Sequence, residues 1–201
     1  MKSEREKGIL LESREKESRQ LYEEHAYVLD YLPFGKPGAG TKFRGGPVIQ
    51  VIGESYFTLL EATVKTGVVL KPFDRVYVGK DSRKEITYIL GRIGFDELTA
   101  NSKMELENAV ERIVLGREAW FVSFFNTSQP ITPRMHALEL IPGIGKKYMW
   151  SILGAREKKL FESFADLQTR VNIPSPAKLI TKRIIEELSG ESKYRLFTRS
   201  S

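Results

Sequence analysis

The chain has 201 residues, of which 41% are hydrophobic and 29% charged, as is ordinary for a soluble globular protein with one large or two small domains. It contains no cysteine and only two histidines, which excludes disulfides, thiol catalysis and thiolate zinc sites and argues against a histidine metal site. The net charge of +6 lies wholly in residues 130–201, where 13 Lys and Arg stand against 7 Asp and Glu, as expected of a nucleic-acid-binding module.

A charged N-terminal arm is predicted at residues 1–24, where acidic and basic side chains alternate at short spacing. Such alternation is typical of a solvated helix or a disordered segment, and a partner-docking arm is the alternative. The first residues do not resemble a secretory signal, and no apolar run in the chain is long enough to span a bilayer. We therefore expect a cytoplasmic protein without a membrane partner.

Residues 25–129 contain short apolar and alternating runs that predict a β-domain with one helix. The helix is expected at 101–115, capped by Asn101 or Ser102, and the strands at 26–32, 48–53, 56–65, 74–79, 85–93 and 119–125. Strands of this number and length favour a small closed barrel that is similar to the OB fold. An SH3-like barrel remains the alternative, because the helix precedes the last strand instead of lying between the third and the fourth.

The loop at residues 34–47 is dense in glycine and carries basic residues without an acid. It lacks the order of a nucleotide-binding loop, because Thr41 precedes Lys42 and a strand follows where a helix is needed. We expect Lys42 and Arg44 to contact nucleic acid from a flexible loop. Four barrel side chains are predicted to add a basic and aromatic groove, although ordinary barrel surface is the better interpretation of any single one: Tyr56, Arg75, Tyr77 and Arg92.

The most specific motif is a hairpin at residues 141–147, with the sequence Ile-Pro-Gly-Ile-Gly-Lys-Lys, between two predicted helices. Pro142 ends the first helix, and the second is expected at 146–153 with Gly154 as its stop.

This hairpin predicts a binding site for a phosphate of a nucleic-acid backbone. Gly143 and Gly145 can adopt positive φ and let another molecule approach the main chain. The first amides of the following helix have no intrahelical partner and carry the positive end of its dipole. Lys146 and Lys147 add full charges, so a phosphate is held without reading any base. The predicted contacts are Gly143, Ile144, Gly145, Lys146 and Lys147.

The segment resembles the helix-hairpin-helix family, whose hairpin has a hydrophobic residue, Gly, a second hydrophobic residue and Gly. Ile141, Gly143, Ile144 and Gly145 match these positions. The resemblance implies sequence-independent binding to the DNA or RNA backbone. The family usually has a small residue where Met149 stands, so we expect the two helices to be spaced more widely. An ordinary helical hairpin is the alternative.

A second helix-break-helix pattern follows at a shift of 29 residues, with Ile173 in the place of Ile144. It predicts a doubled helix-hairpin-helix domain at residues 130–190, because an isolated hairpin cannot bury its own apolar face. A short polar linker at 126–130 leads into this domain, and Thr132 is expected to cap its first helix.

The second hairpin is expected to bind phosphate more weakly or not at all, because Pro174 removes an amide donor. Its basic residues Lys178, Lys182 and Arg183 are predicted to remain as surface charges, with Lys178 and Lys182 as further candidate contacts. Residues 191–201 form a basic tail that is expected to be disordered until nucleic acid binds.

The chain from about residue 24 to its end resembles the family of uncharacterised proteins known as DUF655. The resemblance is carried by the sequence Ala-Tyr-Val-Leu-Asp-Tyr-Leu-Pro at 26–33, the barrel region, and the hairpin at 140–147. It implies an α+β protein with a small N-terminal OB-like β-barrel and a C-terminal all-α doubled helix-hairpin-helix domain. It also implies nucleic-acid binding, with no assigned catalytic residue. We expect neither a metal nor a cofactor.

Two other functions remain open. A DNA glycosylase-like repair enzyme also uses a helix-hairpin-helix followed by a catalytic aspartate, and Asp166 lies at a similar distance from Lys147. Strands in the first half argue against that all-helical enzyme, so Asp166 is better interpreted as a solvated or capping residue. The second alternative is an adaptor of the transcription or translation machinery, in which the hairpins pack on a protein partner.

Overall fold

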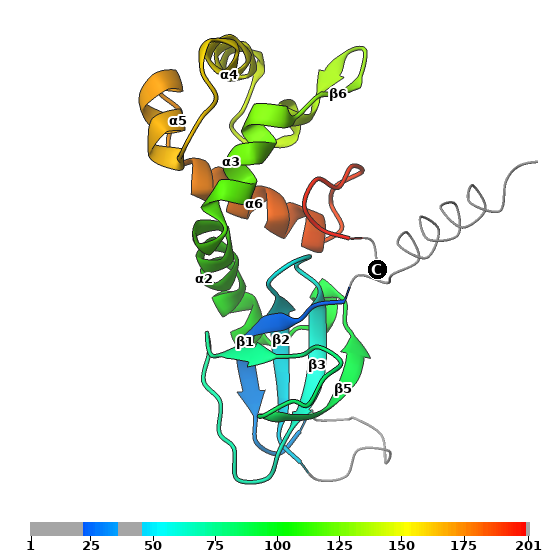
Figure 1. Ribbon diagram of the computed structural model, residues 1–201. Coiled ribbons are helices and arrows are strands. Elements are labelled where there is room, and N and C mark those ends of the chain that lie inside the picture. The colour runs from blue at the N-terminus through cyan, green and yellow to red at the C-terminus, as the bar shows by residue number, and fades with distance from the viewer. Residues whose placement is uncertain (1–21, 36–45, 200–201) are drawn as a thin grey trace, which may run out of the picture.

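The structure is a computed structural model that describes residues 22–35 and 46–199 (Figure 1). Within these residues a curled sheet lies at one end of the molecule and most of the helices lie at the other, which confirms the predicted α+β class. Most of the N-terminal arm lies outside the described residues, and so do Lys42 and Arg44 of the glycine-rich loop.

Five antiparallel strands form the sheet, in the order β4-β1-β2-β3-β5. They are β1 (His25–Leu32), β2 (Val48–Gly53), β3 (Leu59–Val64), β4 (Arg75–Tyr77) and β5 (Ile86–Arg92), and they confirm the five strands predicted between residues 26 and 93. No ladder joins β4 to β5 among the described strands, so the sheet is a half-barrel with two edges. The closed barrel expected from the sequence is therefore not formed.

The two faces of the sheet pack into separate clusters of buried side chains. On β2, Ile49 and Val51 belong to the cluster inside the curl, whereas Ile52 belongs to the cluster shared with the helices. This alternation follows the two-residue period of a strand. Gln50 is fully buried, and its side-chain oxygen accepts the Thr99 amide at 2.8 Å. The bond ties the middle of the sheet to the start of the helix that follows.

That helix is α2 (Ala100–Gly116), preceded by the short 3-10 helix η2 (Phe95–Glu97). Thr99 caps α2, because its hydroxyl accepts the Ser102 amide at 3.0 Å. The predicted helix is confirmed, but the predicted caps Asn101 and Ser102 are wrong by two or three residues.

The next element is a helix, α3 (Glu118–Thr127), where the sequence predicted a strand at 119–125. The strand prediction is wrong because the buried side chains Phe121, Val122 and Phe125 share one helical face instead of alternating. A short aromatic run fits both periods, and here the packing of the rings on the helical cluster favours the helix.

Residues 128–140 differ most from the predicted linker and helix. They contain a small hairpin of β6 (Pro130–Thr132) and β7 (Met135–His136), and then the short 3-10 helix η3 (Ala137–Leu140). The prediction of a helix that begins at Thr132 is wrong. The short helix η3 begins later and is capped by His136, whose Nδ1 accepts the Leu138 amide at 3.1 Å. Burial, and then the charge of Arg156, lower the pKa of His136 below 6.5, so the ring stays neutral and able to accept.

Three helices complete the fold: α4 (Lys146–Lys158), α5 (Phe164–Val171) and α6 (Pro176–Leu188). Gly154 does not stop α4, which continues for another turn. Arg170 closes its C-terminal end by donating to the carbonyls of Ala155 and Lys159 at 2.7 Å each. No helix in the described part of the chain is both long and apolar enough to cross a membrane.

One cluster of buried side chains runs from the sheet to the last helices. It includes Ile52 of β2, Leu106 of α2, Phe121 of α3, Ile152 of α4 and Ile184 of α6. The hairpin-bearing helices and the sheet therefore share a continuous core through α2 and α3, and α2 packs directly along α6.

The C-terminal segment, residues 191–199, is held against the molecule by Glu187 of α6, whose side chain is fully buried. Its carboxylate accepts the amides of Leu196, Phe197 and Thr198 at 2.7, 3.1 and 2.9 Å. The tail expected to be disordered is thus fixed over residues 191–199, because a buried carboxylate needs these donors.

Candidate nucleic-acid interface

The first hairpin has the expected positive φ at one of its two glycines, whereas the other is extended. Gly143 adopts a φ of +88°, in the left-handed region that favours glycine. The turn is closed by the Ile144 amide, which donates to the Ile141 carbonyl at 2.9 Å. Ile144 is 3% exposed and anchors the hairpin in the core. Gly145 is the N-cap of α4 and is extended, with φ −84° and ψ −179°.

The residues that are predicted to hold phosphate lie at the surface. Gly143, Gly145, Lys146 and Lys147 are all exposed. Among the described residues, none accepts a hydrogen bond from the amides of Gly145, Lys146 or Lys147, and no carboxylate pairs with either lysine. The positive end of the α4 dipole, open amides and two ammonium groups are therefore presented together.

The sequence interpretation missed an aromatic side chain beside this hairpin. Trp150 is 66% exposed, although tryptophan is on average a highly buried residue. It follows Lys146 by four positions and Lys147 by three, so it shares their side of α4. The spacing Lys-Lys-x-x-Trp was visible in the sequence, but nothing local distinguished an exposed tryptophan from a core one.

Gly143 also has a packing role that the sequence did not indicate. A Cβ at this position would lie 3.2 Å from Cδ2 of Leu179 in α6. The first hairpin therefore sits against the first turns of α6, next to the second hairpin. Met149, which replaces the small residue of the family pattern, is buried, and the close approach occurs at Gly143 instead.

The second hairpin repeats part of this geometry. Asn172 adopts a positive φ of 56°, like Gly143 29 residues earlier. The residue after it, Ile173, is buried, like Ile144 after Gly143. The helix that follows begins with Pro176, which has no amide hydrogen to offer a ligand. The second hairpin thus keeps the anchoring isoleucine but has fewer open amides than the first.

The basic residues of α6 separate into two kinds. Lys178 and Lys182 are exposed, and no ion pair to either is found among the described residues. Arg183 is buried, with its Nε 2.9 Å from Glu187 Oε1, and its guanidinium also donates to the Tyr194 carbonyl. The prediction of Arg183 as a surface charge is therefore wrong, because it is the counter-ion of a buried carboxylate.

Glu23 also contradicts the predicted solvated arm, because only 5% of it is exposed. Its carboxylate accepts the amides of Ser55, Tyr56 and Thr58 at 2.8 to 3.1 Å, which holds the turn between β2 and β3.

The predicted groove on the sheet is not assembled as expected. Arg75 is ion-paired with Glu54 at 2.8 Å, and the Tyr77 hydroxyl is hydrogen-bonded within its own loop. The ring of Tyr56 lies under the Arg199 guanidinium at 3.8 Å. Arg92 is exposed and lines a cleft together with residues of the C-terminal segment.

Asp166 occupies the third position of α5 and forms part of a structural clasp. Its carboxylate accepts the Glu162 amide at 3.2 Å and pairs with Arg170 at 3.1 Å. Desolvation raises the pKa of Asp166, but the Glu162 amide and Arg170 outweigh it and hold the pKa below its ordinary value. Arg170 in turn closes α4, so this pair stabilises the connection of two helices.

Within residues 22–35 and 46–199, no group of three or more His, Asp or Glu side chains is placed to hold a metal ion.

Comparison with known proteins places the chain in a defined group. A family model described as "Protein of unknown function (DUF655)" matches residues 22–199. A curated relative from Methanocaldococcus jannaschii, "Uncharacterized protein MJ0038", is 42% identical over 186 residues, covering 92% of this chain and 83% of its own. The crystal structure of Af1531 from Archaeoglobus fulgidus, also assigned to DUF655, matches with a TM-score of 0.81 and 45% identity over 88% of this chain and all of its own.

Proposed function

Since the chain belongs to the DUF655 family, whose description assigns no activity, we propose its function from the geometry. The protein binds the sugar-phosphate backbone of a nucleic acid, DNA or RNA, without reading base sequence. It does so through the first hairpin, which acts as a helix-hairpin-helix, and it requires no cofactor and catalyses no reaction.

The observation that carries this proposal is the open N-terminus of α4. Amides at Gly145, Lys146 and Lys147 have no acceptor among the described residues, and two exposed lysines stand beside them. A phosphate bound there would gain charge-assisted hydrogen bonds and two Coulombic partners. Main-chain amides contact the phosphate of every nucleotide alike, so they confer affinity and not sequence specificity.

The rest of the fold suits the same ligand. The second hairpin lies against the first through Leu179 and Gly143, and it offers Lys178 and Lys182 at the surface. This pairing supports a doubled helix-hairpin-helix module. The curled five-stranded sheet resembles an OB fold in its antiparallel half-barrel shape, and OB folds commonly bind single strands.

A protein-interaction adaptor is the second candidate, because large apolar side chains are exposed on α4 and just past its end. Trp150 is 66% exposed and Leu160, just past the end of α4, is 60% exposed. Exposed apolar side chains of this size also mark protein docking surfaces. The glycosylase alternative gains no such support, since Asp166 is engaged with Arg170 and the Glu162 amide.

The test is a salt titration of binding to single- and double-stranded DNA and RNA. We expect the affinity to fall steeply with salt, and the charge-removing pair Lys146→Gln with Lys147→Gln to lower the log–log slope by about 1.4 to 1.8. The matched control is Lys71→Gln with Lys84→Gln, two exposed lysines of sheet loops. Binding that resists salt, or a hairpin pair no weaker than the control pair, contradicts the proposal and favours the adaptor.

A further inference from the structure

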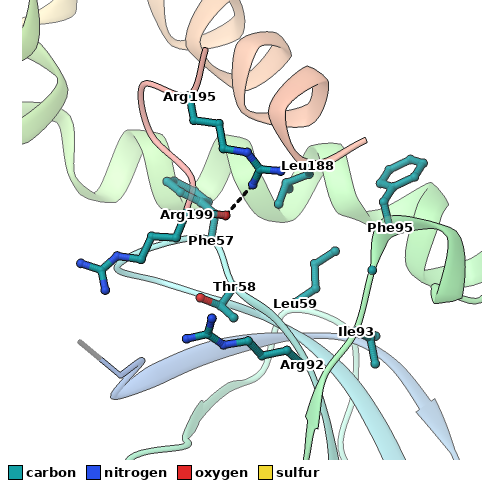
Figure 2. Close-up of a pocket in the computed structure, with 10 residues that line it drawn as sticks. Phe57, Thr58, Leu59, Arg92, Ile93, Phe95, Leu188, Arg195 and Arg199 are labelled. Atoms are coloured by element: carbon teal, nitrogen blue, oxygen red, sulfur yellow. Dashed lines mark hydrogen bonds between the residues drawn. The ribbon is translucent and has the colours of Figure 1, made fainter. Parts of the chain in front are cut away.

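A second basic opening lies between the sheet and the C-terminal segment (Figure 2). Arg92, at the end of β5, lines one side of it, and Arg195 and Arg199 of the C-terminal segment line the other. The remaining lining residues are neutral, with apolar walls from Leu59, Ile93, Phe95 and Leu188 among them. We call this opening the arginine cleft.

All the charged side chains that line the cleft are positive. No Asp or Glu is among its lining residues. In the described part of the chain, no carboxylate is ion-paired with Arg92 or Arg195. Low-dielectric walls around charges of one sign concentrate the field and attract anions. The cleft is therefore suited to an anionic ligand.

The two arginines of the C-terminal segment are held in place by the core. The buried Glu187 accepts the amides of Leu196, Phe197 and Thr198, which lie between Arg195 and Arg199. The Phe197 ring packs edge-on against Trp120, Phe121 and Phe124 at centroid distances of 5.0 to 6.1 Å. Arg195 also donates to the Arg199 carbonyl, the bond drawn in Figure 2. The segment is thus preorganised, which reduces the entropy that a ligand must overcome.

We propose that the arginine cleft is a second phosphate-binding site, and, resting on the proposed function, that the phosphate belongs to the same nucleic-acid chain that the hairpin binds. All three cations are arginines, whose planar guanidinium groups match phosphate oxygens in pairs.

A chain of phosphates fits the surroundings better than a single free anion. A neighbouring opening shares Thr58 and Arg92 with the cleft. Its lining adds two cations, Lys80 and Arg83, and one carboxylate, Glu23, which already accepts three main-chain amides. The Nε atom of Arg83 is buried and has no hydrogen-bond partner among the described residues. Basic groups therefore continue beyond the cleft, as a polymer with repeated phosphates requires.

The positions of the two sites along α6 bear on the length of the ligand. Leu179 lies next to Gly143 of the hairpin, and Leu188 lines the cleft. Nine residues of helix correspond to about 14 Å along the axis and about half a turn around it. A straight short oligonucleotide accordingly fills one site, whereas a longer strand that curves around α6 reaches both.

The experiment compares wild type, the cleft variants Arg92→Gln and Arg195→Gln, and the Lys146→Gln/Lys147→Gln pair. Each is studied in salt titrations with a single-stranded oligonucleotide of about 30 nucleotides. The Arg92 side chain makes no hydrogen bond or ion pair among the described residues, so its variant is expected to fold normally, as a thermal melt will show. The matched control is Arg134→Gln, an exposed arginine in the β6–β7 turn that lines neither site. We expect Arg92→Gln to weaken binding about fivefold and to lower the salt slope by about one, and the effects of the two sites to multiply.

The outcomes separate the two proposals. If Arg92→Gln and Arg195→Gln both behave like Arg134→Gln while the hairpin pair loses affinity, the cleft is overturned and the proposed function stands. If the cleft variants lose affinity and the hairpin pair does not, the cleft stands and the hairpin assignment is overturned. Inorganic phosphate is the second probe, and the melting temperature is the measurement. If phosphate raises the melting temperature of wild type but not of Arg92→Gln, the cleft binds phosphate. If Arg92→Gln also leaves oligonucleotide binding unchanged, the site serves a free anion and the polymer assignment is wrong.

Discussion

Replacing Gly145 with valine is expected to block ligand approach to the open amides of α4 while leaving the fold intact. Gly145 has φ −84° and ψ −179°, which is extended backbone that valine adopts without strain. A Cβ at this position meets no atom within 4 Å, so the added side chain fits without a clash and stands beside the open amides of Gly145 and Lys146.

The expected loss of affinity follows from the number of contacts removed. A hydrogen bond to a charged group contributes about 1.5–3 kcal/mol, so losing one such bond lowers affinity by about 10- to 150-fold. The cost in stability is smaller, because Gly145 makes no side-chain cap and valine is a poorer N-cap by about 1 kcal/mol. For a chain of this size that shifts the melting temperature by about 2–4 °C.

The assay is fluorescence anisotropy of a labelled oligonucleotide, with circular dichroism to check folding. Gly116→Val is the matched control, because its added side chain also meets nothing within 4 Å and it lies at the end of α2, away from the hairpin. Gly143→Val is not a clean probe, since Gly143 has positive φ and faces Leu179 at 3.2 Å, so it is expected to destabilise the domain. A folded Gly145→Val variant that binds as tightly as Gly116→Val would refute the reasoning.

Three further predictions concern other parts of the molecule. In a Trp120→Phe background, Trp150 is the only tryptophan, and because it is exposed beside the hairpin its fluorescence is expected to be quenched by single-stranded nucleic acid; unchanged emission at saturation would exclude base stacking there. Glu187→Gln is expected to destabilise the protein by about 3–5 kcal/mol in urea unfolding, because it leaves Arg183 buried without a counter-ion; a change below about 1 kcal/mol would contradict the role given to this carboxylate. Burial lowers the pKa of His136 below its unfolded value of 6.5, so on acidification the unfolded state takes up a proton before the folded state does. The free energy of unfolding is therefore expected to decline as pH falls from about 7 to about 5. Melting curves should show a smaller decline in His136→Gln.

The strands and the hairpin could be predicted because their signals are local. β1, β2 and β5 lie within two residues of the expected ranges, since alternation and flanking turns are encoded by adjacent residues. The positive φ of Gly143 and the start of α4 at Lys146 follow from glycine and helix-start chemistry within a few positions.

The elements that were predicted wrongly depend on partners far along the chain. The run at 119–125 fits a strand or a helix, and only packing against the helical cluster makes it α3. The segment predicted as a helix from Thr132 forms part of a β-hairpin and one 3-10 helix. His136 in this segment lies close enough to Arg156 of α4 for its charge to lower the pKa of the histidine. Interactions of this kind have no signature within a local window.

The sequence by itself determined the composition class, the excess of positive charge after residue 130, the five strands and the glycine turn that opens α4. Each of these depends on residue types at short spacing. Only the tertiary structure decided that Arg183 is buried with Glu187, that the C-terminal segment is fixed, and that Arg92 meets Arg195 and Arg199 in one cleft. Burial and charge pairing are set by contacts between distant residues, and a sequence read in order does not contain the distances on which they depend.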